Sequence, residues 1–260
     1  MIEAYFDRDE GDWFVPTDYS RGPWVDDACH AGPPTGLLAR AMEQIVTDQR
    51  MTRITVELMR PIPMRGFRVL ASMVKLGRSA SVTEAELSDD DGIYARAHGL
   101  HMRELDHLAV SIADDLAPDF EASEPGPFPI QPPHGLAAFN DSVECRYDPS
   151  TRPGGGPSTM WMRTKVPLLQ GEKPSPFQAI CPLADCLNGI SYNDPIEEVW
   201  FVNADLTLSL HRDPTGEWFC AQAVSLWEPS GIGLAHAALF DTEGSVGRAT
   251  QNLLLSAIDG

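Results

Sequence analysis

The cysteines are the first residues whose type and spacing could support chemistry. The chain has five, an odd number with no CxxC pair, which favours reduced thiols in a cytoplasmic protein over a disulfide framework. Cys181 and Cys186 have no matching pair of Cys or His elsewhere, so their spacing does not support a structural zinc site. Cys186 follows Asp185 and suggests a nucleophile, but no histidine has an identifiable pairing with it. We therefore expect no metal, and covalent chemistry at Cys186 remains a minor alternative.

The composition is that of an ordinary globular protein with a strongly acidic balance. The 260 residues are 43% hydrophobic and 22% charged, enough for one large domain or two small ones. With 19 basic and 38 acidic residues the formal net charge is −19, which disfavours binding to nucleic acid or to an anionic membrane. The acidic N-terminus lacks the features of a signal peptide, and no stretch approaches the roughly 18 apolar residues of a membrane-spanning helix. These features predict a cytoplasmic protein.

Two helical stretches and the strands that follow them form the framework that must position a site. Residues 30–49 place apolar residues at helical spacing. Strand-like runs follow at residues 54–59, 67–75, 79–87 and 93–102, and the last two are joined by a turn at residues 89–92. This order predicts a helix followed by a four-stranded antiparallel meander. A second helix, predicted over residues 176–188 with Asn188-Gly189 as its C-cap, is again followed by strands.

The second half of the chain repeats the first at a constant offset. Arg60 and Arg212 are 152 residues apart, and the same offset relates nine further identical pairs with no gap between Thr55 and Ala249. These pairs are Gly92 with Gly244, Asp89 with Asp241, Leu87 with Leu239, Phe67 with Phe219, Thr55 with Thr207, Leu58 with Leu210, Ala71 with Ala223, Arg96 with Arg248 and Ala97 with Ala249. Because turns, strand ends and element order agree together, we interpret the chain as an internal duplication.

The duplication divides the chain into two units and a linker. Residues 1–104 form the first unit and residues 139–260 the second. Residues 105–138 between them are rich in proline and begin with an acidic lead-in, which is typical of a linker. A shorter Gly/Pro stretch at residues 152–157 predicts a hairpin or an exposed loop inside the second unit.

Particular segments of both units resemble a known family. In the first unit they are Val56-Glu57-Leu58-Met59-Arg60-Pro61, Asp90-Asp91-Gly92 and Ala95-Arg96-Ala97. In the second they are Leu183-Ala184-Asp185, Asn203-Ala204-Asp205-Leu206, His211-Arg212 and Gly247-Arg248-Ala249-Thr250-Gln251. In this order and spacing the chain resembles the double-hotdog acyl-CoA thioesterases of the TesB type. The resemblance covers nearly the whole chain and implies an α+β tandem double hotdog, in which two units of one helix and an antiparallel sheet form one continuous sheet.

The resemblance also implies an active site in the second unit. The family uses an Asp on the helix, a Thr or Ser at the start of the next strand and a Gln on the final strand, and these positions fall on Asp185, Asn203 and Gln251. Asn203 departs from the hydroxyl residue: it can hydrogen-bond a water or a carbonyl but cannot relay a proton. The implied reaction is hydrolysis of an acyl-CoA thioester to the free acid and CoA, with no cofactor and with the acyl chain in a tunnel between helix and sheet.

Elementary physics is consistent with Asp185 as the base in this reaction. Thioester hydrolysis needs a base, an oriented water and donors to the carbonyl oxygen, for which backbone N–H groups of the central helix are candidates. The helix end and the apolar neighbours of Asp185 both disfavour a charged carboxylate and make it a stronger base. At the offset of 152 residues, Asn203 and Gln251 correspond to Met51 and Gly99, whose side chains cannot polarise a water. We therefore expect one active site per chain, in the second unit.

Structural interpretations of the same residues stay open. Asp185 could instead be a hydrogen-bonding device at the end of its helix, and Gln251 could be a strand residue that faces solvent. Asp205 shares a strand face with Asn203, but an ion pair with the position of Arg53 is at least as good an explanation for it.

For substrate binding we select His30 and Arg212. His30 lies at the mouth of the first helix, where a helix cap is an equal alternative, and the correspondence of Arg212 with Arg60 also favours a structural role. The phosphates of CoA require a local basic patch in so acidic a protein. The candidates for this patch are Lys165, Lys173, Arg163 and Arg212.

Two other functions compete with thioester hydrolysis. A non-catalytic module that binds an acyl group or another small ligand is suggested by the departure at Asn203. Hydration of an enoyl-CoA is suggested by Asn193-Asp194-Pro195, although no histidine follows this segment. A double hotdog already contains the dimer that single hotdogs form between chains, so a homodimer is open but not required.

Overall fold

Strands predominate in the chain. The computed structural model describes residues 3–9, 11–106, 108–111, 115–132, 135–151 and 155–257. The helices are α1 (Gly32–Glu43), α2 (Pro176–Ala184) and α3 (Leu187–Ser191), with two 3-10 helices, η1 (Asp18–Ser20) and η2 (Phe139–Ser142). The strands are β1 (Phe6–Arg8), β2 (Trp13–Pro16), β3 (Arg50–Leu58), β4 (Phe67–Lys75), β5 (Ala80–Asp89), β6 (Gly92–Met102), β7 (Glu124–Gly126), β8 (Val143–Tyr147), β9 (Ser158–Thr164), β10 (Val199–Asn203), β11 (Asp205–Leu210), β12 (Phe219–Trp227), β13 (Ile232–Asp241) and β14 (Gly244–Ala257).

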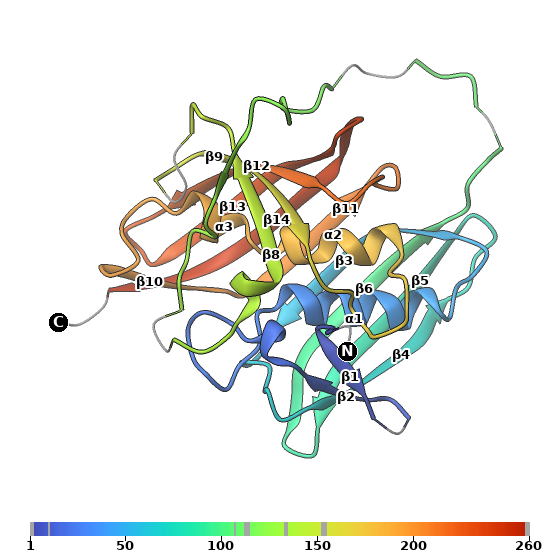
Figure 1. Cartoon of the computed structure of the whole chain (residues 1–260). Helices are drawn as coiled ribbons and strands as arrows, with labels where there is room; N and C mark the ends of the chain where they lie inside the picture. The colour runs from blue at the N-terminus through green and yellow to red at the C-terminus, as the bar shows by residue number, and fades with distance from the viewer. Residues whose placement is uncertain are drawn as a thin grey trace.

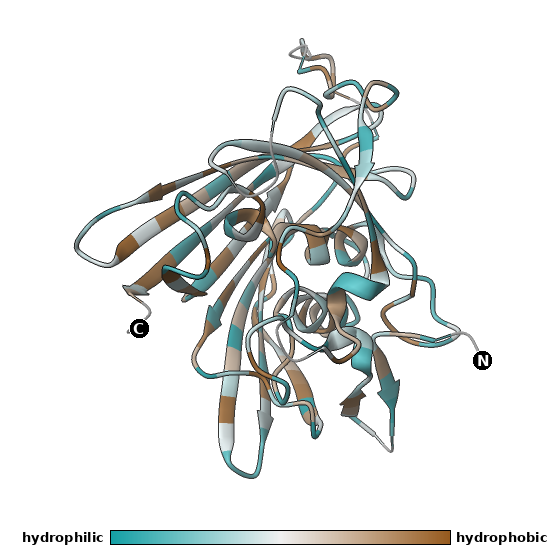
Figure 2. Cartoon of the chain, turned by 60° about the vertical axis from the view of Figure 1, so that its left-hand side comes forward, coloured by the Kyte–Doolittle hydropathy of each residue, from teal (hydrophilic) through white to brown (hydrophobic). Residues whose placement is uncertain are grey.

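Within the described residues, the strands form one 14-stranded antiparallel sheet. Its order is β1-β2-β4-β5-β6-β3-β11-β14-β13-β12-β9-β8-β7, and β10 pairs separately with β14. Figure 1 shows α1 and α2 side by side against this sheet, and Figure 2 shows apolar and polar residues alternating along its strands, as expected where one face is buried. This architecture confirms the predicted α+β double hotdog.

The predicted four-stranded meander is wrong in one respect. The strands β4, β5 and β6 follow one another in the sheet, but β3 pairs with β6 rather than with β4. The connection from β3 to β4 therefore crosses the width of the unit. This crossing leaves the second edge of β3 available for β11, and the β3–β11 pair joins the two units into a continuous sheet. Alternation of apolar residues predicts strands but not which strands are neighbours.

The strand boundaries confirm the internal duplication. The bounds of β12 and β13 lie 152 residues after those of β4 and β5, and β14 begins at the same offset from β6. At the junction of the units, Thr207 pairs with Thr55, and their hydroxyl oxygens lie 3.1 Å apart. Because these two residues are themselves equivalent at the 152-residue offset, an approximate twofold axis passes between them.

The two long helices pack antiparallel. A Cβ atom on Gly32, at the start of α1, would lie 2.8 Å from the Cα atom of Pro182 near the end of α2, so only glycine permits this approach. At the other end, Glu43 accepts hydrogen bonds from the Ser175 hydroxyl and from Gln178 Nε2, and Ser175 caps α2. The packing therefore places the start of α1 beside the end of α2.

The second helical stretch is broken, contrary to our prediction of one helix over residues 176–188. Pro182 cannot donate a backbone hydrogen bond, and α2 ends two residues later at Ala184. The chain bends at Asp185 and Cys186 and continues as α3. Asn188-Gly189 therefore lies inside α3 and is not a C-cap.

The remaining segments add detail to the predicted organisation. The turns before Gly92 and Gly244 both have a positive φ at the glycine, which explains the identity of this residue in the two units. The segment 105–138 contains β7 and the buried side chains of Phe128 and Ile130, so part of it belongs to the sheet and the core. Within the Gly/Pro stretch 152–157, residues 152–154 lie outside the described residues. No helix in the described ranges is long and apolar enough to cross a membrane.

Candidate active site

Asp185 lies at the bend between α2 and α3, where its main chain and its side chain both need partners. Its backbone carbonyl accepts a hydrogen bond from Gln251 Nε2 at 2.9 Å. Its carboxylate oxygen Oδ1 accepts from Asn203 Nδ2 at 2.9 Å and from Gln251 Nε2 at 3.2 Å. The structure thus brings together the three residues named for catalysis. The contact to the backbone carbonyl also agrees with the helix-end role that we left open for Asp185.

His30 supplies the second partner of the Asp185 carboxylate. Its Nδ1 atom lies 3.0 Å from Asp185 Oδ2, and its ring stacks on Phe139 with a centroid distance of 4.0 Å. The same Nδ1 lies 3.2 Å from the backbone nitrogen of Gly32. With Asp185 ionised, Nδ1 makes only one of these hydrogen bonds at a time, because the first requires its proton and the second its lone pair. His30 is therefore part of the site, a pairing that sequence reasoning missed.

Asn203 and Gln251 occupy different places around Asp185. Asn203, at the end of β10, lines a cavity together with Asp185 and His30. Its Oδ1 atom is buried and has no hydrogen-bond partner among the described residues. Gln251 is fully buried on β14, is not among the residues that line the cavity, and accepts a hydrogen bond from the backbone N–H of Asn188. The alternative of a solvent-facing Gln251 is therefore wrong.

The cavity has a volume of about 540 Å³ and largely apolar walls. Trp24, Trp200 and Phe201 form an aromatic cluster on one side, with ring centroids 4.6 Å and 4.9 Å from Trp24. Phe128 and Ile130, from the segment predicted to be a linker, complete another part of the wall. Exposed residues such as Met59 and Leu254 mark where the cavity meets solvent. The site thus combines a carboxylate with space for an apolar group.

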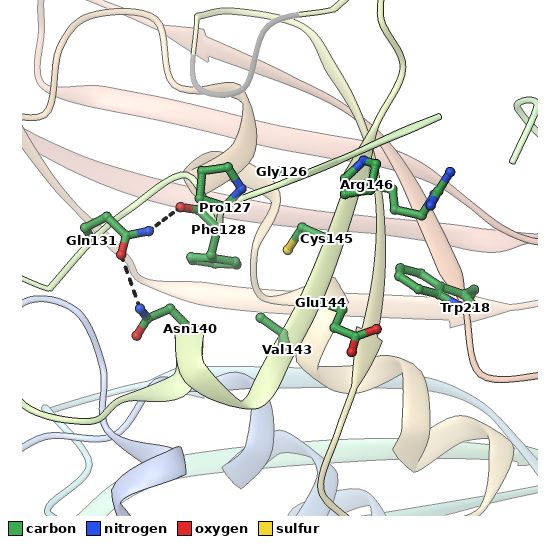
Figure 3. Close-up of a pocket in the computed structure, with 11 residues that line it drawn as sticks. Gly126, Pro127, Phe128, Gln131, Asn140, Val143, Glu144, Cys145, Arg146 and Trp218 are labelled. Atoms are coloured by element: carbon green, nitrogen blue, oxygen red, sulfur yellow. Dashed lines mark hydrogen bonds between the residues drawn. The ribbon is translucent and has the colours of Figure 1, made fainter. Parts of the chain in front are cut away.

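A second cavity of about 400 Å³ lies beside β7 and β8. Figure 3 shows Gln131 bonded both to the carbonyl of Phe128 and to Asn140 at its edge, with Arg146 and Trp218 on the other side. Phe128 contributes to the walls of both cavities. None of the residues proposed for catalysis lines this second cavity.

The equivalent place in the first unit is filled. Met51 is buried, and a Cβ atom on Gly99 would lie 2.6 Å from Thr83 Oγ1 and 2.9 Å from Met42 Sδ. No side chain can therefore enter at the position that corresponds to Gln251 without displacing its neighbours. The two sulfur-containing side chains take the space that polar groups occupy in the second unit.

Cys186 has a histidine nearby, but its environment does not favour a nucleophile. Its Sγ atom lies 3.9 Å from His30 Nε2 and 3.1 Å from the carbonyl oxygen of Pro182, to which it donates. Burial, followed by the nearby Asp185 carboxylate, raises the pKa of the Cys186 thiol well above its usual value. A thiol that stays protonated is a poor nucleophile and metal ligand. No group of three or more potential metal ligands occurs in the part of the chain that the structure describes.

Asp205 and Arg212 do not reach the cavity. Asp205 pairs across the sheet with Glu57 and accepts two hydrogen bonds from Asn252, so the suggested ion pair with Arg53 is wrong. Arg212 forms a bidentate contact with the buried Asp241, with both distances at 2.6 Å. Hydrogen bonds to Asp241 raise the pKa of Arg212, in spite of its partial burial.

The other predicted cations give no basic patch at the cavity. Arg163 pairs with Glu144 and Glu217, and neither it nor Lys165 or Lys173 lines the cavity. Of the residues chosen for substrate binding, the structure thus places His30 in the cavity and Arg212 outside it.

Two family models match the chain. One, described as the acyl-CoA thioesterase N-terminal domain, matches residues 20–102. The other, described as the acyl-CoA thioesterase C-terminal domain, matches residues 113–255. No curated protein sequence matches the chain.

Solved structures share the fold at low sequence identity. A protein of Novosphingobium aromaticivorans is similar with a TM-score of 0.75 and 16% identity, over 98% of this chain and 99% of that one. A hot dog fold protein of unknown function from Alicyclobacillus acidocaldarius has a TM-score of 0.74 and 14% identity, over 97% and 96%. The acyl-CoA thioesterase II TesB2 of Mycobacterium marinum has a TM-score of 0.68 and 14% identity, over 98% and 96%.

Proposed function

The chain belongs to the acyl-CoA thioesterase family, and from this premise we propose that Asp185 activates the water that hydrolyses its acyl-CoA substrate. The observation that carries the proposal is the Asp185 carboxylate, which lines an apolar cavity and is held by His30, Asn203 and Gln251. A carboxylate fixed in this way is oriented before the substrate arrives.

Each proton of the attacking water has a defined destination in the reaction. Asp185 accepts a proton from the water while the water oxygen bonds to the thioester carbonyl carbon. The carbon–sulfur bond then breaks, and the proton on Asp185 passes to the departing thiolate. The second water proton stays on the carboxylic acid product, and Asn203 orients the base through the hydrogen bond from its Nδ2 to Asp185 Oδ1. In this scheme Asn203 needs no hydroxyl group, because it does not relay a proton.

His30 and Gln251 position the base. His30 donates from Nδ1 to Asp185 Oδ2, which leaves Oδ1 to the two amide donors. Gln251 contacts Asp185 from the side of the core, because it bonds Asp185 and the start of α3 but does not line the cavity. The acyl group lies against the aromatic wall formed by Trp24, Trp200 and Phe201.

The test compares Asp185→Asn with the wild type in an assay of thiol release from a panel of acyl-CoA thioesters. We expect kcat to fall by about 10²–10⁴, the usual contribution of a general base. Asp205→Asn is the matched control, because Asp205 carries the same carboxylate at the start of β11, does not line the cavity and, among the described residues, accepts its side-chain hydrogen bonds from Asn252. Its activity should stay near that of the wild type.

Two outcomes would contradict the proposal. Equal, slow thiol release by the wild type and by Asp185→Asn would favour a non-catalytic module that binds acyl groups. A product that keeps its thioester and gains water would instead identify an enoyl-CoA hydratase.

A further inference from the structure

A polyanionic substrate would meet one permanently charged cation among the described residues that line the cavity. Of the described residues that line it, Arg60 is the one Lys or Arg, and Asp185 is the one carboxylate. Arg60 is exposed, as are its neighbours Met59 and Pro61, so this segment forms part of the mouth. The phosphates of CoA remain near the mouth while the acyl group enters the apolar interior. In a protein of net charge −19, a cation at this place has a large effect on binding.

The internal duplication shows what is unusual about Arg60. Its equivalent in the second unit, Arg212, is neutralised by the bidentate contact with Asp241. The equivalent of Asp241 is Asp89, but Asp89 pairs with Arg65 at 2.6 Å and accepts a hydrogen bond from the Tyr94 hydroxyl. In the first unit a different arginine, Arg65, therefore pairs with the carboxylate of Asp89.

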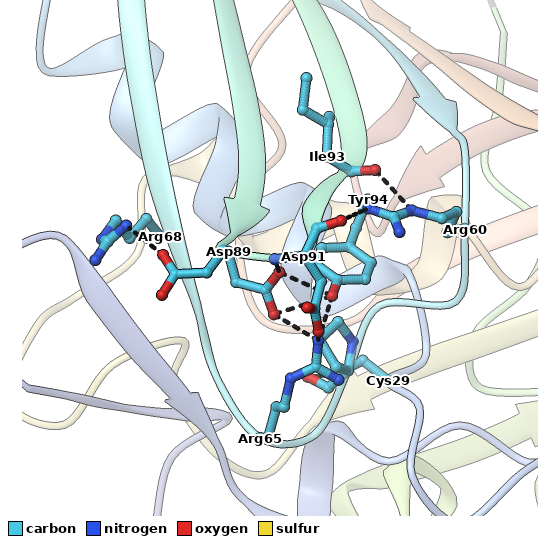
Figure 4. Close-up of polar contacts among 10 residues, drawn as sticks. Cys29, Arg60, Arg65, Arg68, Asp89, Asp91, Ile93 and Tyr94 are labelled. Atoms are coloured by element: carbon cyan, nitrogen blue, oxygen red, sulfur yellow. Dashed lines mark hydrogen bonds and ion pairs between the residues drawn. The ribbon is translucent and has the colours of Figure 1, made fainter.

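Arg60 is held in place without being neutralised. Figure 4 shows its guanidinium on the carbonyl oxygens of the turn, with distances of 3.1 Å from Nε to Ile93 and 3.2 Å from Nη2 to Asp91. Its Cζ atom lies 4.6 Å from the centroid of the Tyr94 ring. No carboxylate lies within ion-pair distance of Arg60 among the described residues. A guanidinium has five N–H donors, so donors remain for an oxyanion.

We propose that Arg60 binds the phosphate oxyanions of CoA at the mouth of the cavity. This inference rests on the proposed function, since it requires that the thioester lie at Asp185. Arginine suits this role because its planar donors match phosphate oxygens in pairs. Arg212, which we selected from the sequence, has the same position in the other unit but is committed to Asp241. The two arginines differ because Asp89 is paired with another arginine, whereas Asp241 is paired with Arg212.

The experiment measures binding of free CoA and of pantetheine, which lacks the phosphates, by calorimetry. It uses Asp185→Asn as the background, so that the result does not depend on turnover. We expect Arg60→Gln to weaken CoA binding by about tenfold or more, as for loss of hydrogen bonds to a charged group, and to leave pantetheine binding unchanged. Added salt should reduce the difference, because the contact is exposed.

Arg96→Gln is the matched control, because Arg96 is half exposed on β6, pairs weakly with Glu86 at 3.7 Å and does not line the cavity. It should bind CoA like the background protein. The inference is overturned if Arg60→Gln binds CoA normally, or if it weakens CoA and pantetheine equally.

An anionic acyl group offers the same chemistry from another source. If Arg60→Gln in the otherwise wild-type chain slows hydrolysis of a succinyl but not of an acetyl thioester of N-acetylcysteamine, the phosphate assignment is also wrong. A wild type inactive on all thioesters would refute the hydrolase function without altering the CoA binding result.

Discussion

At the residue scale, the groups around Asp185 divide into those that touch the cavity and those behind it. His30 and Asn203 line the cavity, whereas Gln251 contacts Asp185 from the core. The resemblance of short motifs was enough to predict that Asp185, Asn203 and Gln251 converge. It could not predict the contact of His30 with Asp185, because these residues come from loops of different units and no spacing relates them. The depth of Gln251 also depends on packing that sequence motifs do not encode.

Gln251→Leu tests the positioning role. The change removes the amide donor to Asp185 and the acceptor of the Asn188 N–H, so the carboxylate loses its fixed orientation. We expect kcat to fall by about tenfold to 10²-fold, as for small misplacements of a catalytic group, while KM stays close to the wild-type value. Steady-state kinetics measure both constants. Asn252→Leu removes an amide from the next residue, which faces Asp205, and should change neither. A rise in KM with unchanged kcat would place Gln251 in substrate binding instead.

At the element scale, the duplicated strands could be predicted from the sequence more accurately than the helices. The bounds of β4 and β5 return at the same offset as β12 and β13, because alternation and turn glycines act locally. The break after α2 was missed although Pro182 is a local signal for it, because apolar residues continue on both sides of Asp185. The pairing of β3 with β6 and β11 is a long-range property that no local pattern contains.

The β13–β14 turn makes a prediction about stability and pH. Burial would raise the pKa of Asp241, but hydrogen bonds from Arg212 and from backbone N–H groups outweigh it and hold this pKa below its usual value. The unfolded chain therefore binds protons more readily than the folded one. The stabilisation is complete above the ordinary carboxyl pKa of about 3.9 and is lost as the pH falls through the lower folded value.

Asp241→Asn should accordingly destabilise the protein at pH 7 by about 2–3 kcal/mol, the usual effect of losing hydrogen bonds to a charged group. The difference from the wild type should shrink below about pH 4. Denaturant unfolding at several pH values measures it. Asp90→Asn is the control, because Asp90 lies in the equivalent turn and is almost fully exposed. A loss of stability that is the same at all pH values would show that the charge of Asp241 is not responsible.

At the scale of the whole molecule, two similar units enclose one proposed site. The approximate twofold axis between Thr55 and Thr207 relates the strands of the first unit to the equivalent strands of the second. The symmetry ends at the side chains, because Met42 and Met51 fill the space beside Gly99. The first unit instead contributes His30 and Arg60 to the cavity of the second. Neither unit alone therefore contains the proposed site.

This asymmetry predicts that one chain binds one substrate. Calorimetric titration with a thioether analogue of acyl-CoA, which cannot be hydrolysed, should give one site per chain in the wild type and in Asp185→Asn. Gly99→Gln should not create a second site, because its Cβ atom would collide with Thr83 Oγ1 and Met42 Sδ. It should instead lower the midpoint of thermal unfolding, since overpacking a core costs about 1–3 kcal/mol. Two equivalent sites in the wild type would mean that the region filled by Met42 and Met51 opens on binding, and the assignment of a single site to each chain would have to be withdrawn.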